Sequence, residues 1–238
     1  MLIKIIDAKE NLSIQVHPDD AYVKEHETCP FGKTECWYVM DCPENANLVI
    51  GHQAKTREEL RQMIAEGRYE ELIREVPVKK GDFLQIIPGT IHAIKAGFLI
   101  LETQQSSDIT YRVYDYGRLV DGKPRQLHVK QSIDVTNVPD EADKKGLKHA
   151  AEIPVNQLFL LEDCEHYRVW KLQLSGSYQL EQNYPFLILS VLSGEGKLDG
   201  EPLKKGEHLL LPADSGMAEL SGEMELILST TAGPEREG

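Results

Sequence analysis

The stretch that decides the fold is Ser13-Ile14-Gln15-Val16-His17-Pro18-Asp19-Asp20, near the start of the chain. Its first residues are typical of a β-strand, which Pro18 and the two aspartates end. Side chains alternate between the faces of a strand, so Gln15 and His17 point to one side while Ile14 and Val16 pack on the other. An amide oxygen and an imidazole can both bind a metal, but two ligands do not hold one. The stretch predicts a β-sheet whose polar face needs further ligands from elsewhere in the chain.

The composition is that of an ordinary globular protein. The 238 residues are 41% hydrophobic and 27% charged, enough for two units of about 100 residues each. The formal charge of -13 argues against nucleic acid or an anionic membrane surface as the main partner. The four cysteines lack a metal-binding spacing, and the opening segment is too short for a signal sequence or a membrane span. We therefore expect a cytoplasmic protein with free thiols.

Short segments of strand-forming residues, separated by turns, fill the first half of the chain. A helical insertion at about residues 55–75 interrupts them, because Thr56 and Glu59 fit a capping box before an apolar stripe that Gly67 ends. A second short helix is expected at about Tyr69 to Arg74, and an irregular connection at 21–32. The expected strands are Met1–Asp7, Leu12–His17, Thr34–Met40, Asn47–Gly51, Asp82–Ile87, Phe98–Glu102 and Thr110–Asp115.

Residues 139–154 are predicted to be a linker, and residues 155–238 a second all-β unit. The segment Lys205–Ala213 repeats the glycine, strand and proline order of Gly81–Pro88, but no histidine follows it. Regular short strands predict a mainly β protein with a jelly-roll barrel in each half, the second barrel being degenerate. Its strands are expected near Phe159–Leu161, Tyr167–Leu174, Phe186–Ser193 and Glu207–Leu211.

Two further residues complete a candidate ligand set with Gln15 and His17. Glu35 lies in a strand whose alternate side chains share one face, and His92 follows the Pro88-Gly89 turn at the head of the next strand. Two imidazoles, one carboxylate and one amide suit Zn²⁺, with Fe²⁺, Mn²⁺ or Co²⁺ as alternatives, and the lack of thiolates argues against a purely structural zinc. Taken singly, each residue is more often a packed strand residue than a ligand.

The order of four motifs resembles the bacterial type I mannose-6-phosphate isomerases of the cupin superfamily. The motifs are Gln15-Val16-His17-Pro18-Asp19, Gly32–Glu35, Pro88–Ala93 and Ser107–Arg112, and Gln15 stands where most cupins have a histidine. The resemblance covers residues 1–138 and continues more loosely to the end. It implies a metal-binding cupin catalytic domain at 1–138 and a degenerate cupin domain at 155–238. Family members usually carry further N-terminal strands, so the chain is expected to be N-terminally truncated relative to them.

The resemblance implies an enzyme of carbohydrate metabolism that interconverts mannose 6-phosphate and fructose 6-phosphate through a cis-enediol, with one Zn²⁺ per chain. Lys33 is a candidate general acid or base, and Lys4 a basic group close to the metal. Arg112 is expected to stabilise the enediolate or bind the substrate, with Asp108 orienting it or relaying a proton. Surface positions for Lys4, and a plain surface pair of Asp108 with Arg112, are the alternatives.

Two more residues are candidates for substrate binding, namely Arg118 and Glu102. A guanidinium matches phosphate oxygens, although a surface role suits Arg118 equally well. Two other functions stay open: another metal-dependent cupin enzyme, such as an epimerase or an oxygenase, and a non-catalytic sugar-phosphate-binding cupin. The native metal, the residue that transfers the proton and the oligomeric state are left open by the sequence.

Overall fold

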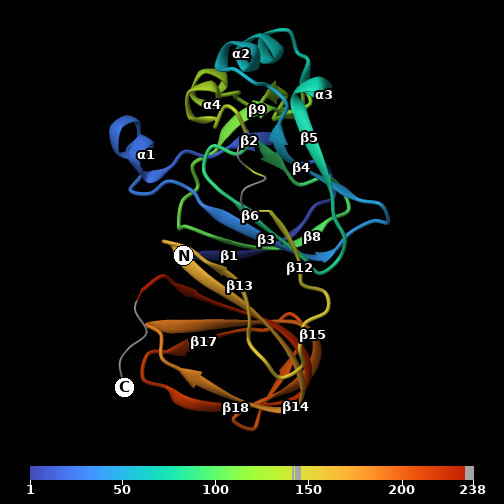
Figure 1. Ribbon diagram of the computed structural model, residues 1–238, viewed down its shortest axis with the longest axis vertical. Coiled ribbons are helices and arrows are strands. Elements are labelled where there is room, and N and C mark those ends of the chain that lie inside the picture. Colours follow the sequence, from blue (N-terminus) through green and yellow to red (C-terminus); the bar gives the residue numbers. More distant parts are fainter. Residues whose placement is uncertain (141, 143–145, 234–238) are drawn as a thin grey trace. The chain divides into compact units, whose positions relative to one another are not determined.

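The computed structural model describes residues 1–140, 142 and 146–233, and it divides into two compact units, Leu2–Lys148 and His149–Gly238. We call them the first and the second unit (Figure 1). Strands dominate both, so the prediction of a mainly β protein is confirmed. None of the helices among the described residues is long and apolar enough to cross a membrane.

The first unit contains two five-stranded sheets. One has the strand order β1 (Leu2–Asp7), β8 (Leu99–Gln104), β3 (Glu35–Asp41), β6 (Asp82–Ile86) and β12 (Leu147–His149). The other has the order β5 (Ile73–Pro77), β4 (Asn47–His52), β7 (His92–Ala93), β2 (Ile14–Val16) and β9 (Tyr111–Tyr114). Strands far apart in the sequence are neighbours in both sheets, as β2 and β7 are. A small hairpin, β10 (Leu119–Val120) with β11 (Lys123–Pro124), lies apart from both sheets.

The inner faces of the two sheets share one hydrophobic core. Trp37 and Val39 from β3, Ile100 from β8 and Leu48 and Ile50 from β4 are buried in the same cluster. Alternate residues of each strand meet there because the side-chain period of a strand is two. Each large apolar side chain buried in this way contributes roughly 1.5–3 kcal/mol. The space between the sheets is therefore a packed interior in which a polar group needs partners.

Three helices cover the outer face of the sheet that contains β2 and β7, as the upper part of Figure 1 shows. They are α2 (Arg57–Ala65), α3 (Tyr69–Leu72) and α4 (Val129–Val135). Ile14 and Val16 of β2 pack there in one cluster with Leu60 and Met63 of α2 and Ile133 of α4. Because neighbouring residues of a strand face opposite ways, Gln15 must point into the space between the sheets.

The helix α2 begins after Thr56, as the capping box predicts. The Thr56 hydroxyl accepts a hydrogen bond from the Glu59 N–H at 3.1 Å. The Glu59 carboxylate, however, accepts from the Lys55 N–H at 2.7 Å, so the second half of the box closes one residue earlier. The second predicted helix was too long, because α3 ends at Leu72 and the chain continues as β5.

The connection at 21–32 was expected to be irregular, but its first part is the helix α1 (Asp20–His26), and only residues 27–32 are irregular. Asp19 caps this helix and accepts a hydrogen bond from the Tyr22 N–H at 2.8 Å. Val23 is its one fully buried residue, which is too few to produce a readable apolar stripe. The predicted linker at 139–154 contains β12, and its residues 141 and 143–145 lie outside the described part of the chain.

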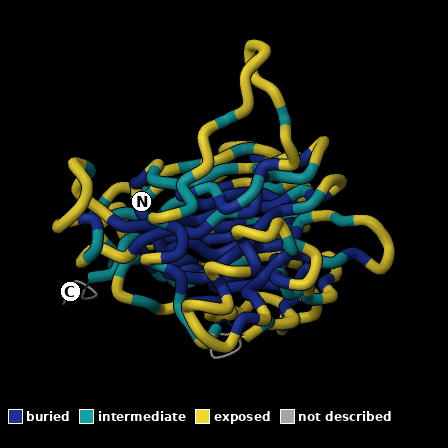
Figure 2. The backbone as a smooth tube through the Cα atoms, turned by 90° about the horizontal axis from the view of Figure 1, so that it is seen from above, coloured by how far each residue is buried: buried dark blue, intermediate teal, exposed yellow. Residues whose placement is uncertain are grey.

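The second unit is one sheet with long, strongly bent strands. Its order is β13 (Phe159–Asp163), β14 (Tyr167–Gln182), β18 (Gly216–Thr231), β15 (Phe186–Leu198) and β16 (Glu201–Lys204), and β17 (His208–Pro212) pairs with β15. Most of these strands run further than expected, and β16 and β18 were not foreseen. Its core is made of apolar side chains, mainly leucines. Figure 2 shows buried residues along the strands and exposed residues in the projecting loops.

Candidate metal centre

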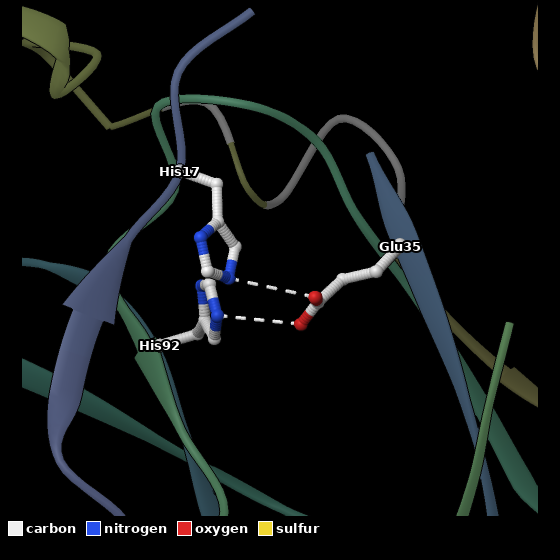
Figure 3. A group of neighbouring side chains, drawn as sticks. All are labelled: His17, Glu35 and His92. Atoms are coloured by element: carbon white, nitrogen blue, oxygen red, sulfur yellow. Dashed lines mark ion pairs between the residues drawn. The ribbon is translucent and has the colours of Figure 1, made fainter. Parts of the chain in front are cut away.

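Three of the predicted ligands, His17, Glu35 and His92, lie together between the two sheets of the first unit (Figure 3). The Nε2 atom of His92 is 3.3 Å from Glu35 Oε1, and that of His17 is 3.5 Å from Glu35 Oε2. One potential ligand atom from each residue lies within 4.8 Å of the others. All three side chains are buried, so the group is closed to bulk water.

The strands explain why these residues meet. Gln15 of β2 is paired in register with His92 of β7, and its amide nitrogen is 3.3 Å from His92 Nε2. His17 comes two residues after Gln15 and points the same way. Glu35 is the first residue of β3 in the opposite sheet. The group therefore bridges the two sheets, and the fourth predicted ligand lies beside it.

The residues present fit a divalent cation. The Glu35 carboxylate is fully buried. Lys33 forms an ion pair with its Oε2 atom, whereas its Oε1 atom accepts no hydrogen bond from a described residue. The His92 Nδ1 atom lies 2.8 Å from the Thr90 carbonyl oxygen, so it carries the proton and leaves the Nε2 lone pair facing Glu35. Two imidazoles and a carboxylate are a common ligand set for such metals. A cation at this point would give a partner to Glu35 Oε1, which no described residue supplies with a hydrogen bond.

The electrostatics prepare the three residues as ligands. Burial, with help from the Lys33 ammonium, lowers the pKa of His17 to about 4, and burial also lowers the pKa of His92. Burial alone would raise the pKa of Glu35, but Lys33 and the two histidines outweigh it and hold that pKa well below its usual range. Near neutral pH the imidazoles are thus uncharged and the carboxylate is ionised.

Lys33 is part of the same buried group. Its Nζ atom is 2.9 Å from Glu35 Oε2 and 3.1 Å from His17 Nε2, and only 6% of the side chain is exposed. An ammonium buried in this way is matched by the carboxylate beside it. Lys33 therefore lies where a proton could be exchanged with a molecule bound next to the histidines.

A second set of predicted residues forms a row on the inner face of the first sheet. The Lys4 ammonium donates to Glu102 Oε1 at 2.8 Å and to Gln104 Oε1 at 2.5 Å. The Trp37 indole N–H donates to Glu102 Oε2 at 3.0 Å, and its ring meets the His92 ring edge to face at 5.4 Å. Lys4 and Glu102 are thus connected to the ligands through Trp37.

Arg112 lies opposite Gln15 in the pairing of β2 with β9. Its Nε atom is buried and makes no hydrogen bond with a described residue. Asp108 is exposed, and within the described residues no ion pair connects its carboxylate to Arg112. No contact among the described residues therefore supports the expectation that Asp108 orients Arg112.

Arg118 is engaged elsewhere. Its guanidinium forms an ion pair with the buried carboxylate of Asp115 and donates to the Asn11 carbonyl oxygen at 2.7 Å. Arg125 also donates to Asp115, at 2.7 Å. Asn11 precedes β2, whereas His17 follows it, so these contacts lie near the other end of that strand from His17.

Sequence reasoning did not identify Gln104, Trp37 or the Thr90 carbonyl as members of the site. For Gln104 the signal was present, because it lies two residues after Glu102 and so shares its face of β8. Trp37 stands in the same relation to Glu35 on β3, so it too shares a face with a candidate residue. The contact of Thr90 with His92 depends on how the turn folds back, which spacing alone does not reveal.

Comparison with known proteins identifies the family. Residues 156–231 match the family model described as mannose-6-phosphate isomerase, cupin domain. Mannose-6-phosphate isomerases of Bacillus subtilis and Streptococcus mutans are 48% and 46% identical to this chain, and each match covers 96% of the chain and 74% and 73% of the relative. The crystal structure of the mannose 6-phosphate isomerase from Bacillus subtilis matches with a TM-score of 0.84 and 40% identity, over 96% of this chain and 74% of that one. The chain belongs to the mannose-6-phosphate isomerase family.

Proposed function

We propose that the protein interconverts mannose 6-phosphate and fructose 6-phosphate, using a divalent metal held by Gln15, His17, Glu35 and His92. The buried group of two neutral imidazoles around an ionised carboxylate is the observation that carries this proposal. The names of the relatives at 46–48% identity supply the substrate. The fold alone would not do so, since one fold serves many reactions.

Zinc is the metal we propose. Two imidazole nitrogens with oxygen ligands are a frequent zinc environment. A mannose 6-phosphate isomerase whose crystal structure is described as bound with zinc and yttrium shares the fold at a TM-score of 0.76, with 16% identity. When bound, the metal would polarise the oxygens on C1 and C2 of the open-chain sugar and stabilise the negative charge that develops there.

The chain's own residues supply the proton transfer. In the aldose to ketose direction a base removes the proton from C2 and returns it to C1, while the O2 hydroxyl proton moves to O1. We assign the carbon proton to Lys33, which is buried beside the ligands, with Lys4 as the alternative because its ammonium is held by Glu102 and Gln104. To remove the proton from C2, Lys33 must be in its neutral amine form. The ammonium that results is matched by the ionised Glu35 carboxylate until it returns the proton to C1.

Arg112 is proposed to hold the charge of the enediolate, because its Nε atom is buried opposite Gln15 with no hydrogen-bond partner among the described residues. Asp108 remains a candidate proton relay from the exposed loop before β9. Glu102 and Arg118 remain candidates for substrate binding. For Arg118 this requires exchange of its present contacts with Asp115 and Asn11.

We further propose that residues 1–138 form the metal-binding cupin domain and residues 155–238 a degenerate cupin domain without ligands, each a jelly-roll barrel, joined by 139–154. The match of residues 156–231 to a cupin model supports the second assignment. We place the protein in the cytoplasm, in keeping with four cysteines that are free thiols.

A coupled assay tests the function. Mannose 6-phosphate should yield fructose 6-phosphate, a chelator should abolish turnover, and Zn²⁺ should restore it. Arg112→Ala should lower kcat/KM by about a hundredfold or more, as expected for a lost charge-stabilising donor, while the metal content stays intact. Arg68→Ala is the matched control, since that arginine pairs with Glu66 and Glu71 on the helical insertion and should leave turnover unchanged.

Two results would contradict the proposal. A folded, metal-loaded protein without turnover would indicate a sugar-phosphate-binding protein. Substrate-dependent uptake of O₂ by an iron-loaded form would indicate an oxygenase.

A further inference from the structure

The Pro88-Gly89 turn is attached to both histidine ligands. The Gly89 N–H donates to the His17 carbonyl oxygen at 2.9 Å. One residue further on, the Thr90 carbonyl accepts the hydrogen bond from His92 Nδ1 at 2.8 Å. A shift of this turn would therefore move the backbone of one ligand and the ring orientation of the other.

Asn137 holds the same turn from the opposite side. Its side-chain Nδ2 donates to the Pro88 carbonyl oxygen at 2.8 Å, and its backbone N–H donates to the Gly89 carbonyl oxygen at 2.9 Å. Its own carbonyl oxygen lies 2.8 Å from His52 Nε2. One residue that contacts no ligand thus makes two bonds to the segment that positions both histidines.

The fit between Asn137 and the turn is close. Gly89 has φ +80°, and a Cβ atom added to it would lie 2.6 Å from Cγ of the Asn137 amide. The amide therefore lies flat against the glycine, in space that a side chain at residue 89 would fill. The contact requires both a glycine in the turn and a planar, hydrogen-bonding group against it.

The backbone before Asn137 is itself anchored. Asn137 comes two residues after α4, whose last carbonyls have no partner within the helix. The Arg57 guanidinium, at the start of α2, donates to three carbonyl oxygens at this end, those of Ile133, Asp134 and Thr136, the last two at 3.1 Å. Asn137 is thus presented to the turn by two helices.

Asn137 also lines a cavity of about 220 Å³ together with Asp19, Tyr22 and Arg57. Truncation of its side chain would widen this cavity and would leave no closed void in a packed core. The cost of removing the amide should therefore come mainly from the lost hydrogen bond and contact with the turn.

We propose that Asn137 is a positioning residue for the metal centre, acting through the Pro88-Gly89 turn on His17 and His92. The inference rests on the metal centre of the proposed function. Metal affinity responds to the groups that orient the ligands, and loss of such a group typically weakens it by about 10–100-fold. Without the Asn137 amide the turn keeps only the hydrogen bond from the backbone N–H of residue 137 to the Gly89 carbonyl oxygen. The positions of His17 and His92 are then less firmly fixed relative to each other.

The test compares Asn137→Ala and Asn137→Asp with the wild-type protein. Zn²⁺ affinity is measured by competition with a chromophoric chelator, and Co²⁺ in place of zinc reports the ligand geometry through its visible spectrum. Both variants should bind Zn²⁺ at least about tenfold more weakly, with an altered cobalt spectrum. Asn137→Asp keeps the planar shape against Gly89 but puts a carboxylate oxygen where the Nδ2 donor faced the Pro88 carbonyl oxygen. It preserves the test should the alanine variant fail to fold.

Asn156→Ala is the matched control, because Asn156 makes a similar clamp in the second unit. Its Nδ2 donates to the Ser175 carbonyl oxygen at 2.7 Å, and its Oδ1 accepts from the Ser175 N–H at 2.9 Å. This variant should keep the wild-type zinc affinity and cobalt spectrum. A folded Asn137→Asp that also keeps both would overturn the proposed role of Asn137. A wild-type protein that takes up neither metal would instead overturn the metal centre itself.

Discussion

The turn at Lys79–Asp82 in the first unit and the turn at Lys204–Glu207 in the second are built by the same contacts. In each, the glycine has φ +87° and its N–H donates to a valine carbonyl oxygen on a neighbouring strand, at 2.8 Å to Val39 and at 2.9 Å to Val191. In each, the acidic side chain accepts a hydrogen bond of 2.9 Å from the N–H of the first lysine. The repeat seen in the sequence is thus also a repeat of backbone geometry.

The same register leads to opposite chemistry. Glu35 lies four residues before the valine of the first unit and pairs with Ile86. Leu187 lies four residues before the valine of the second unit and pairs with Leu211. The position of the carboxylate ligand is therefore occupied by a buried leucine in the second unit.

The comparison shows what a buried ligand requires. An ionised carboxylate removed from water costs several kcal/mol unless charges nearby match it. In the first unit the Lys33 ammonium supplies that charge beside Glu35, and two neutral histidines lie next to it. In the second unit the corresponding cluster consists of apolar side chains, and a leucine is what fits. Similar backbones thus carry a site in one place and only a core in the other.

The largest expected effect comes from giving the first unit the residue of the second. Glu35→Leu should lose bound metal, because the only carboxylate of the group is gone, and turnover should fall by roughly a thousandfold or more. Elemental analysis and the coupled assay measure the two losses. Leu189→Met, a volume-conserving change in the core of the second unit, should keep both. Retention of a full metal equivalent in Glu35→Leu would break the comparison.

The reverse exchange should destabilise without creating a site. Leu187→Glu places a carboxylate in an apolar cluster and should lower the free energy of unfolding of the second unit by on the order of 3 kcal/mol or more. Urea unfolding followed by Trp170 fluorescence in a Trp37→Phe background reports on this unit. A stable variant that takes up a second metal ion would show that register alone makes the site.

Acid should weaken the metal-free first unit. The pKa of His17 is about 4 when folded and about 6.5 when unfolded, so the unfolded chain binds more protons between these values. Stability is therefore full above about pH 6.5 and falls as the pH drops toward 4, by on the order of 3 kcal/mol. The lowered pKa of His92 acts in the same direction. The lowered pKa of Glu35 also does so, once the pH falls below the usual pKa of a glutamate.

Urea unfolding of the metal-free protein between pH 7.5 and 4.5 measures this loss, with Trp37 fluorescence in a Trp170→Phe background as the probe. His17→Gln cannot titrate at that position and should show a shallower pH dependence. An unchanged slope would mean that His17 is not held neutral by its surroundings.

The smallest expected effect tests whether the two turns are equivalent. Gly81→Ala and Gly206→Ala each place a side chain at φ +87° and should each destabilise their own unit by about 1–2 kcal/mol. The same two tryptophan backgrounds separate the units. Clearly unequal losses of stability in the two units would show that the two turns are packed differently although their hydrogen bonds are the same.

Strands and helices with a clear local sequence pattern were predicted. Elements and contacts that depend on residues far away in the chain were missed. The alternation around Gln15 and the cap at Thr56 are readable because every residue involved lies within a few positions. The helices α1 and α4 were missed because each buries only one or two side chains. The sequence left Arg118 with two possible roles, phosphate binding or a surface role, and could not show its ion pair with Asp115, because that contact depends on the burial of the Asp115 carboxylate.

By itself, the sequence determined the mainly β architecture, the faces of the strands and the types of ligand, because alternation and side-chain chemistry are local properties. Only the tertiary structure decided that Glu35 meets His17 and His92 across two sheets, that Lys33 is buried with them, and that Asn137 supports the turn between them. These outcomes depend on strand pairing and burial between residues far apart in the chain, which no spacing along it encodes.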